Sequence, residues 1–317
     1  ISSCENAIQI EPNYAIAHNN LGNVLSELGQ HQKAISSYEK AIQIEPNYAI
    51  AHNNLGNVLS ELGQHQKAKN FYQMAVKYEP KNLVYLYHLS RIDEKILHSN
   101  LKNKIYEIIE KNNSTKNNIA YGNFLLSRYE MKEKKYKQEF NYLIKAHNHY
   151  FELKKEKFEL GVKYCFDDVL QIANFAKLEN LNKRTDYKIK PIFIIGVPRS
   201  GSTLIEKVIG SGEKPVPMGE ETAVFENFVN KKILERQSLN LGSCTELRKE
   251  LYRLYKDKGL IMKKYDNIFT DKSLNNFFYL KLIKEIYPNA KIINCKRDML
   301  SSIVSIFQNN LAELAWT

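Results

Sequence analysis

The residues with the clearest chemical potential form a glycine-bounded loop, GVPRSGST, which runs from Gly196 to Thr203. It overlaps the end of the short apolar run IFIIGV, at 192–197, and the start of an expected helix at 202–210. Backbone N–H groups of such a turn and of a helix N-terminus converge on one place, where they bind phosphate. Arg199 adds a guanidinium group, which can contact two oxygens of an anion at once. The sequence therefore predicts an oxyanion site in this loop.

The loop differs at one position from the G-x-x-x-x-G-K-[ST] loop of nucleoside triphosphatases. That motif places a lysine where this chain has Ser202. Without the lysine, the loop is poorly suited to magnesium-dependent cleavage of a γ-phosphate. A nucleotide kinase-like protein stays an alternative, and magnesium-dependent ATP binding would reveal it.

Three further segments carry polar residues that could complete the site. The GEET segment offers two adjacent carboxylates, Glu220 and Glu221. NIFTDKS brings Lys272 to the end of an expected strand, and KRDMLSSIVS places Arg297 and Ser305 eight residues apart. A structural alternative is that Glu220 and Glu221 only stabilise a helix N-terminus and that Lys272 is a solvated surface residue.

Together these motifs resemble the sulfotransferases that use 3′-phosphoadenylyl sulfate (PAPS), over about residues 188–310. The chain is most similar to the tyrosylprotein sulfotransferase branch and to bacterial proteins that join tetratricopeptide repeats to such a domain. The resemblance implies that the loop holds the 5′-phosphate and the sulfuryl group through Arg199, Ser200, Gly201, Ser202 and Thr203. It also implies that Arg297 and Ser305 hold the 3′-phosphate.

The resemblance further implies a mechanism. Glu221 matches the glutamate that removes the proton of the acceptor hydroxyl, with Glu220 as the alternative if the register is off by one. Lys272 matches a lysine that stabilises the transferring sulfuryl group. Arg199 is expected to act with it in offsetting the negative charge that develops there. No metal is expected, since the sequence contains no evident cluster of metal ligands.

The sequence departs from the family pattern in two respects. Ser273 and Leu274 follow Lys272, where the bacterial relatives are expected to carry a proline soon after the lysine. We expect the effect to be local. The chain also begins at Ile1 inside a repeat and stops at Thr317, soon after the 3′-phosphate motif. We therefore expect the catalytic domain to be truncated, which leaves the activity of this chain open.

An α/β fold is expected to position these residues. Short apolar runs rich in β-branched residues predict strands at 192–197, 267–273 and 290–297. Helical spacing predicts helices at 202–210, 221–238, 245–265, 275–287 and 300–310. Strand and helix alternate, so we predict a parallel, P-loop-like α/β sulfotransferase domain.

The N-terminal part contains an internal repeat. The segment AIQIEPNYAIAHNNLGNVLSELGQHQKA occurs at 7–34 and again at 41–68, with a period of 34 residues. This period is typical of tetratricopeptide repeats, each of which is a pair of helices. Gly22 lets the two helices approach closely, Tyr38 fills the seam between them, and Pro46 ends the unit.

The remaining helical sequence is more degenerate. A third copy is expected near 120–152, where Glu139 replaces the expected small residue, and a connecting helix is expected at 155–181. We predict a helical repeat domain at 1–182 and a sulfotransferase domain at 188–317.

The composition is that of a folded protein, not of a disordered or membrane-spanning chain. Hydrophobic residues make up 43% and charged residues 26% of the 317, which is ordinary for a folded protein. The net charge of +11 favours anionic partners, but no recognition motif supports nucleic acid. Four cysteines without a C-x-x-C pair favour a reducing compartment, and we predict a cytoplasmic location. No apolar run reaches the roughly 18 residues that would span a membrane.

A function of another class competes with the enzyme. Stacked repeats form concave peptide-binding surfaces, so the chain could be an interaction scaffold with an inactive or incomplete nucleotide-binding domain. Affinity for PAP, the desulfated cofactor, would separate the two. The repeats favour a protein or peptide acceptor, tyrosine included, while a carbohydrate, lipid or small-metabolite hydroxyl stays open.

Overall fold

The computed structural model describes residues 2–111, 114–179, 189–262 and 267–308. The chain divides into two compact units, Ile1–Lys154 and Lys155–Thr317. The domain boundary predicted from the sequence falls on residues 180–188, which lie outside the described residues, and it stays a prediction. Among the described residues, no helix is long and apolar enough to cross a membrane.

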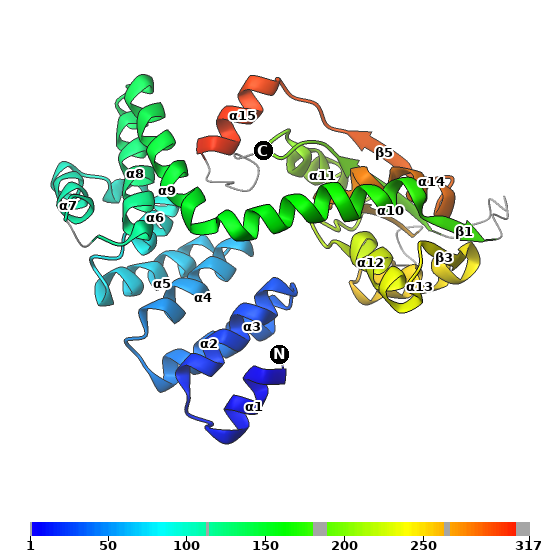
Figure 1. Cartoon of the computed structure of the whole chain (residues 1–317), viewed down its shortest axis with the longest axis horizontal. Helices are drawn as coiled ribbons and strands as arrows, with labels where there is room; N and C mark the ends of the chain where they lie inside the picture. The colour runs from blue at the N-terminus through cyan, green and yellow to red at the C-terminus, as the bar shows by residue number, and fades with distance from the viewer. Residues whose placement is uncertain (1, 112–113, 180–188, 263–266, 309–317) are drawn as a thin grey trace. The chain divides into compact units, whose positions relative to one another are not determined.

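Helices build the first unit, which is coloured from blue to green in Figure 1. In chain order they are α1 Ser2–Ile10, α2 Ala15–Glu27, α3 His31–Ile44, α4 Ala49–Glu61, α5 His65–Tyr78, α6 Leu83–Ile92, the 3₁₀ helix η1 Glu94–Ile96, α7 Ser99–Ile109, α8 Lys116–Lys132 and α9 Tyr136–Lys163, whose residues after Lys154 belong to the second unit. Helix α2 packs on α3, and α4 packs on α5. The two predicted repeats are therefore confirmed as two helical hairpins.

Each hairpin closes on a contact between a glycine and a tyrosine. A Cβ atom on Gly22 would lie 2.6 Å from Cε1 of Tyr38, and one on Gly56 would lie 2.7 Å from Cε1 of Tyr72. Carbon atoms do not approach so closely, so only glycine admits the ring at this distance. Both tyrosines are buried. The close approach predicted at these glycines is confirmed.

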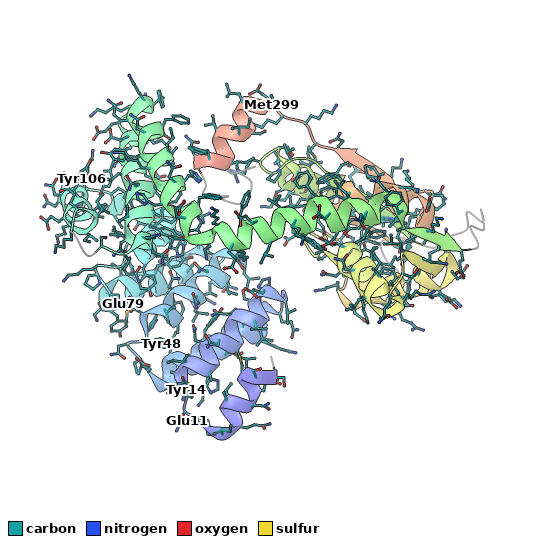
Figure 2. All side chains as sticks on the ribbon, viewed as in Figure 1. Glu11, Tyr14, Tyr48, Glu79, Tyr106 and Met299 are labelled. Carbon is teal, nitrogen blue, oxygen red and sulfur yellow. The ribbon has the colours of Figure 1, made fainter. Side chains whose placement is uncertain are left out.

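The turns before the hairpins also repeat. The N–H of Tyr14 donates to the carbonyl oxygen of Glu11 at 3.2 Å, and that of Tyr48 donates to Glu45 at 3.0 Å. Figure 2 shows Glu11, Tyr14, Tyr48 and Glu79 along one edge of the first unit. The period of the sequence is therefore kept by the backbone as well as by the packed side chains.

Helices α8 and α9 occupy the region of the predicted third copy. The ring centroids of Phe124 and His147 lie 5.0 Å apart, and those of Tyr121 and Tyr150 lie 5.6 Å apart. Glu139 is buried in α9. Aromatic contacts thus join this helix pair where the two earlier hairpins use a glycine against a tyrosine.

The second unit combines short strands with helices. After α9 its elements are the π-helix η2 Tyr164–Val169, α10 Leu170–Phe175, β1 Lys177–Glu179, β2 Lys190–Ile195, α11 Ser202–Gly210, α12 Val224–Arg236, β3 Asn240–Ser243, α13 Cys244–Asp257, β4 Ile268–Asp271, the 3₁₀ helix η4 Leu274–Tyr279, α14 Leu280–Ile286, β5 Lys291–Asn294 and α15 Met299–Gln308.

Strand β2 lies at the centre of a three-stranded parallel sheet with the order β4-β2-β5. Ile192 pairs with Thr270 of β4 and with Lys291 of β5. Phe193 and Phe269 are fully buried in the core. Because the three strands are parallel, their carboxyl ends meet at one edge, which is where ligands bind in such sheets. The predicted parallel α/β architecture is confirmed.

The helices predicted at 221–238 and 245–265 have wrong boundaries, and the one predicted at 275–287 begins as the 3₁₀ helix η4. The helix expected from Glu221 begins at Val224, because Ala223 before it has a left-handed φ of 48°. The helix expected over 245–265 ends at Asp257, and Gly259 follows with a φ of 74°. Glycine in this conformation commonly ends a helix.

Two strands were not predicted. The helix expected over 155–181 ends at Phe175 and is followed by β1, which pairs in parallel with β3. These strands have 3 and 4 residues, too few to show an alternating pattern. Their conformation depends on their mutual pairing.

Candidate active site

The loop between β2 and α11 has the backbone of an anion-binding turn. Gly196 and Gly201 have φ angles of 151° and 94°, and Arg199 has a φ of 67°. Left-handed backbone is strained for an arginine, and strain of this kind gathers at functional positions. Gly201 precedes Ser202, the first residue of α11, and has no side chain to cap the helix. The first N–H groups of α11 are therefore suited to an external acceptor.

Close packing shapes the floor of the loop. A Cβ atom on Gly196 would lie 2.6 Å from the carbonyl oxygen of Cys295 and 2.8 Å from Oγ of Ser200. Ser200 is 9% exposed, and its Oγ has no hydrogen-bond partner among the described residues. Leaving a buried hydroxyl unpaired costs about 1–3 kcal/mol. A polar ligand atom at this place would remove that cost.

Residues from the ends of β2 and β5 meet at Arg199. Its Nε donates to Oγ of Ser305 in α15 at 2.9 Å, and Nη1 of Arg297 donates to its carbonyl oxygen at 3.2 Å. Both arginines are exposed. The structure thus brings together three of the residues that the sequence singles out for phosphate binding.

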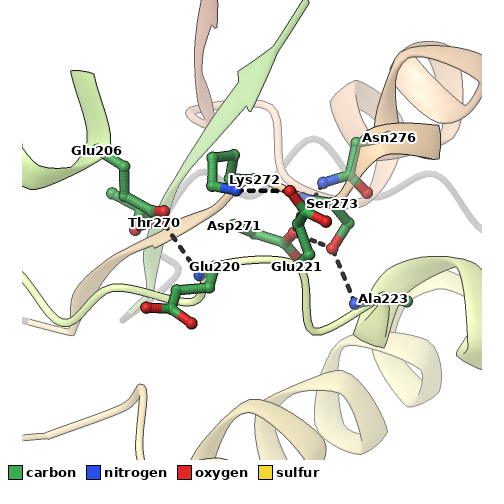
Figure 3. A network of polar contacts seen from close by, with 9 residues as sticks. All are labelled: Glu206, Glu220, Glu221, Ala223, Thr270, Asp271, Lys272, Ser273 and Asn276. Atoms are coloured by element: carbon green, nitrogen blue, oxygen red, sulfur yellow. Dashed lines mark hydrogen bonds and ion pairs between the residues drawn. The ribbon is translucent and has the colours of Figure 1, made fainter. Parts of the chain in front are cut away.

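Lys272 follows β4 directly and lies at the same edge of the sheet. Its Nζ is 2.8 Å from Oε1 of Glu221, as Figure 3 shows. The lysine side chain is 6% exposed, whereas that of Glu221 is 56% exposed. The ammonium group is therefore held in place, while the carboxylate can meet a group that arrives from solvent.

Glu220 has a different position. Its side chain points away from Lys272 in Figure 3. Its backbone N–H donates to Oε1 of Glu206 at 3.0 Å, and its carbonyl oxygen accepts from the N–H of Lys272 at 2.9 Å. Of the two carboxylates that the sequence left open, Glu221 is the one that contacts the lysine.

Glu206 was not recognised from the sequence. It is 1% exposed in α11, and its Oε1 accepts from Oγ1 of Thr270 at 2.6 Å as well as from Glu220. The N–H of Gly219 donates to the same Thr270 hydroxyl at 3.2 Å, and a Cβ atom on Gly219 would overlap the carbonyl oxygen of Thr270. Glu206 therefore joins the helix after the loop, the GEET segment and β4. The only signal in the sequence was a single acid among the apolar residues of α11.

Asp271 forms a second buried network that the sequence did not reveal. It is fully buried and accepts from the Tyr255 hydroxyl at 2.8 Å, from Nδ2 of Asn276 at 2.8 Å and from the N–H of Ser273 at 3.0 Å. Burial raises the pKa of Tyr255 well above its usual value, so its hydroxyl stays protonated and donates. Oγ of Ser273 accepts from the N–H of Ala223 at 2.8 Å. Through Ser273, the network joins the backbone just after Glu221 to the residues that flank Lys272.

The described residues contain no group of three or more histidine, cysteine, aspartate or glutamate side chains that could hold a metal ion. Arg199 and Arg297 supply positive charge at the loop, and Lys272 supplies it at the end of β4. The arrangement therefore places a loop with the backbone of an anion-binding turn and an exposed carboxylate at one edge of a parallel sheet.

Two segments of the chain match models of known protein families. Residues 191–316 match the model of the sulfotransferase family, and residues 13–78 match that of the tetratricopeptide repeat. An uncharacterized protein of Aquifex aeolicus (strain VF5) is 31% identical over 205 residues, which are 61% of this chain and 26% of that protein. The chain thus spans about a quarter of the length of this curated relative.

Two solved structures resemble the chain at 19% identity. YrrB, described as a TPR protein with an unusual peptide-binding site, matches with a TM-score of 0.34 over 52% of this chain and 84% of its own. MamA matches with a TM-score of 0.35 over 49% and 87%. The family matches, taken with the two helical hairpins and the parallel sheet, lead to one conclusion: the chain carries a sulfotransferase family domain preceded by tetratricopeptide repeats.

Proposed function

We propose that the protein transfers a sulfuryl group from PAPS to the hydroxyl group of an acceptor. The observation that carries the proposal is the 2.8 Å contact between Glu221 and the buried Lys272, at the sheet edge that also holds the phosphate-type loop. A base exposed to solvent beside a fixed cation suits proton removal from an alcohol next to a developing negative charge.

The chemistry of the donor set fits PAPS. Ser200 offers a buried hydroxyl without a partner among the described residues, and Gly196 leaves room where a Cβ atom would clash. The residues that would hold the 5′-phosphosulfate are Arg199, Ser200, Gly201, Ser202 and Thr203. Arg297 and Ser305 would hold the 3′-phosphate. When bound, PAPS supplies the sulfuryl group and a phosphate leaving group.

Each residue of the chain then has a defined task. Glu221 accepts the proton of the acceptor hydroxyl at its carboxylate, a role worth about 10²–10⁴-fold in rate. Lys272 orients that carboxylate through the ion pair and, with Arg199, offsets negative charge on the transferring group. The Glu206 and Asp271 networks keep the Glu221 segment and β4 in register.

The acceptor that we propose is a hydroxyl group on a protein or peptide, tyrosine included. The tetratricopeptide repeats support this assignment, because stacked helical hairpins form extended surfaces that bind peptides. The repeat unit would then bind the acceptor chain and raise its effective concentration at the transfer site.

Calorimetric titration with PAP and ADP tests the donor site. We expect PAP to bind more tightly than ADP, since only PAP carries the 3′-phosphate. Arg297→Ala should weaken PAP binding about tenfold or more, because it removes a charge-assisted contact, and should leave ADP binding unchanged. Arg253→Ala removes the same charge from an exposed position on α13 and should have no effect. Equal affinity of the wild-type protein for PAP and ADP, or no PAP binding, would overturn the proposal.

A further inference from the structure

A polar cavity of about 310 Å³ lies in the repeat unit between α4, α5 and α6. This volume is at the lower end of the range for ligand sites in proteins. The side chains that line it carry one permanent cation, two imidazoles and two hydroxyls, with no carboxylate among them: Ser60, His65, Tyr72, His88, Arg91 and Ile92.

The internal repeat provides a comparison for this cavity. Ser60, His65 and Tyr72 have identical counterparts one period earlier, at Ser26, His31 and Tyr38. The counterparts of the other three differ: Asn54 stands for His88, Asn57 for Arg91 and Val58 for Ile92. The cavity therefore combines the same helix pair with a cation that the first repeat lacks.

Amide groups bridge the earlier position. Nδ2 of Asn54 donates to Oδ1 of Asn19 and to Oδ1 of Asn23, each at 3.0 Å, and the Tyr38 hydroxyl donates to Asn23 at 2.9 Å. The amide groups at this position are hydrogen-bonded within the repeats, and no arginine stands there.

Arg91 is different, because it forms no salt bridge with any described residue. The acids that follow it in sequence are engaged elsewhere: Asp93 pairs with Lys69 at 2.7 Å, and Glu94 pairs with Arg128 at 3.3 Å. The positive charge of Arg91 therefore remains available to a ligand.

Two neighbours of Arg91, His88 and Tyr72, present neutral polar groups. Burial, followed by the charge of Arg91, lowers the pKa of His88 to about 4, so this histidine is neutral at pH 7. Its Nδ1 lies 2.8 Å from Oδ1 of Asn53. Burial also raises the pKa of Tyr72 to about 12, so its hydroxyl keeps its proton and donates to Asn57 at 2.9 Å. No anion of the cavity itself competes for the guanidinium group.

We propose that this cavity binds a carboxylate side chain of an acidic peptide segment, with Arg91 as its principal contact. A guanidinium fork matches the two oxygens of a carboxylate. A single cation beside imidazole and hydroxyl groups suits one acidic side chain in a peptide, whereas nucleic acid requires a row of cations along its backbone. The assignment deepens the proposed binding of a protein or peptide by the repeats. It makes acidic residues in the bound segment part of the specificity.

The test is a binding experiment on the full chain that requires no donor and no turnover. Fluorescein-labelled hexaglutamate is titrated with the protein at low salt, and polarisation is recorded. Unlabelled hexaglutamine serves as the competitor that differs only in charge. We expect Arg91→Asn to weaken hexaglutamate binding about tenfold, from the loss of a charge-assisted hydrogen-bonded contact, and hexaglutamine not to compete. Since Asn57 is the natural counterpart of Arg91, this variant should fold, which its circular dichroism melting curve checks.

Lys33→Asn is the matched control, because it removes the same charge from an exposed position in α3. A loss below twofold in this variant supports a specific site at Arg91. Equal losses in Arg91→Asn and Lys33→Asn would overturn the proposal in favour of non-specific attraction to a basic protein. Displacement of hexaglutamate by an equal concentration of inorganic phosphate would overturn it in favour of a simple anion site. Failure of PAP binding would leave this result unaffected, so the two proposals fail separately.

Discussion

The two glycine–tyrosine hairpins of the repeat unit and the candidate site of the sulfotransferase unit bury different kinds of group. The seam of each hairpin is an aromatic ring against a glycine, Tyr38 on Gly22 and Tyr72 on Gly56. The second unit buries charged side chains beside its candidate site, such as Glu206 at 1% and Lys272 at 5% exposure. The glycine–tyrosine contact occurs in both hairpins, because the repeated sequence supplies the same two residues each time. Buried charges are costly unless fully hydrogen-bonded, so we interpret their concentration around one strand end as the consequence of function.

The largest expected effect comes from Glu221, because it acts on the reacting proton. Glu221→Gln removes the basic oxygen but keeps the shape of the side chain. We expect turnover to fall about 10²–10⁴-fold and PAP affinity to stay unchanged. The measurement is transfer from PAPS radiolabelled on sulfur to a tyrosine-containing copolymer.

Glu220→Gln provides the matched control for that experiment. The two residues are adjacent, but Glu220 contributes only backbone atoms to the contact with Lys272. Its variant should retain most of the turnover. A larger loss in Glu220→Gln than in Glu221→Gln would show that the acid next to Lys272 is not the base.

A smaller effect is expected from breaking the buried network at Glu206. Glu206→Ala leaves the Thr270 hydroxyl and the Glu220 N–H without their acceptor, which should cost about 1–3 kcal/mol of unfolding free energy. Glu206→Gln should cost less, since it can retain the oxygen that accepts both bonds. Urea denaturation measures the difference.

Glu213→Ala is the control for charge, because Glu213 is exposed and lies outside the network. Its unfolding free energy should change by less than about 0.5 kcal/mol. Equal stability of Glu206→Ala and Glu213→Ala would mean that the network does not hold the second unit together, and the contrast between the two units would lose its basis.

The two units also differ in how far their structure could be predicted from the sequence. The 34-residue period predicts both hairpins, because their main contacts lie within one repeat or between neighbours. The strand ends that carry Arg199, Lys272 and Arg297 were likewise predictable from short apolar runs. Strands β1 and β3 were not, since each is too short to show a pattern and exists by pairing with the other. Glu206 is recognisable only once Thr270, from another segment, is known to face it.

The smallest effect is expected at Gly56. It tests whether the close contact between Gly56 and Tyr72 stabilises the hairpin. Gly56→Ala places a methyl group 2.7 Å from the Tyr72 ring. Overpacking of this kind costs about 1–3 kcal/mol, while the better helix propensity of alanine returns about 1 kcal/mol. We therefore expect a net loss of about 1 kcal/mol of unfolding free energy, and the same loss for Gly22→Ala. Gly161→Ala in α9 meets nothing within 4 Å and should be stabilising. If urea denaturation found Gly56→Ala as stable as Gly161→Ala, the Tyr72 ring would be free to move aside, and close packing at the glycine could not be what joins the helices of the hairpin.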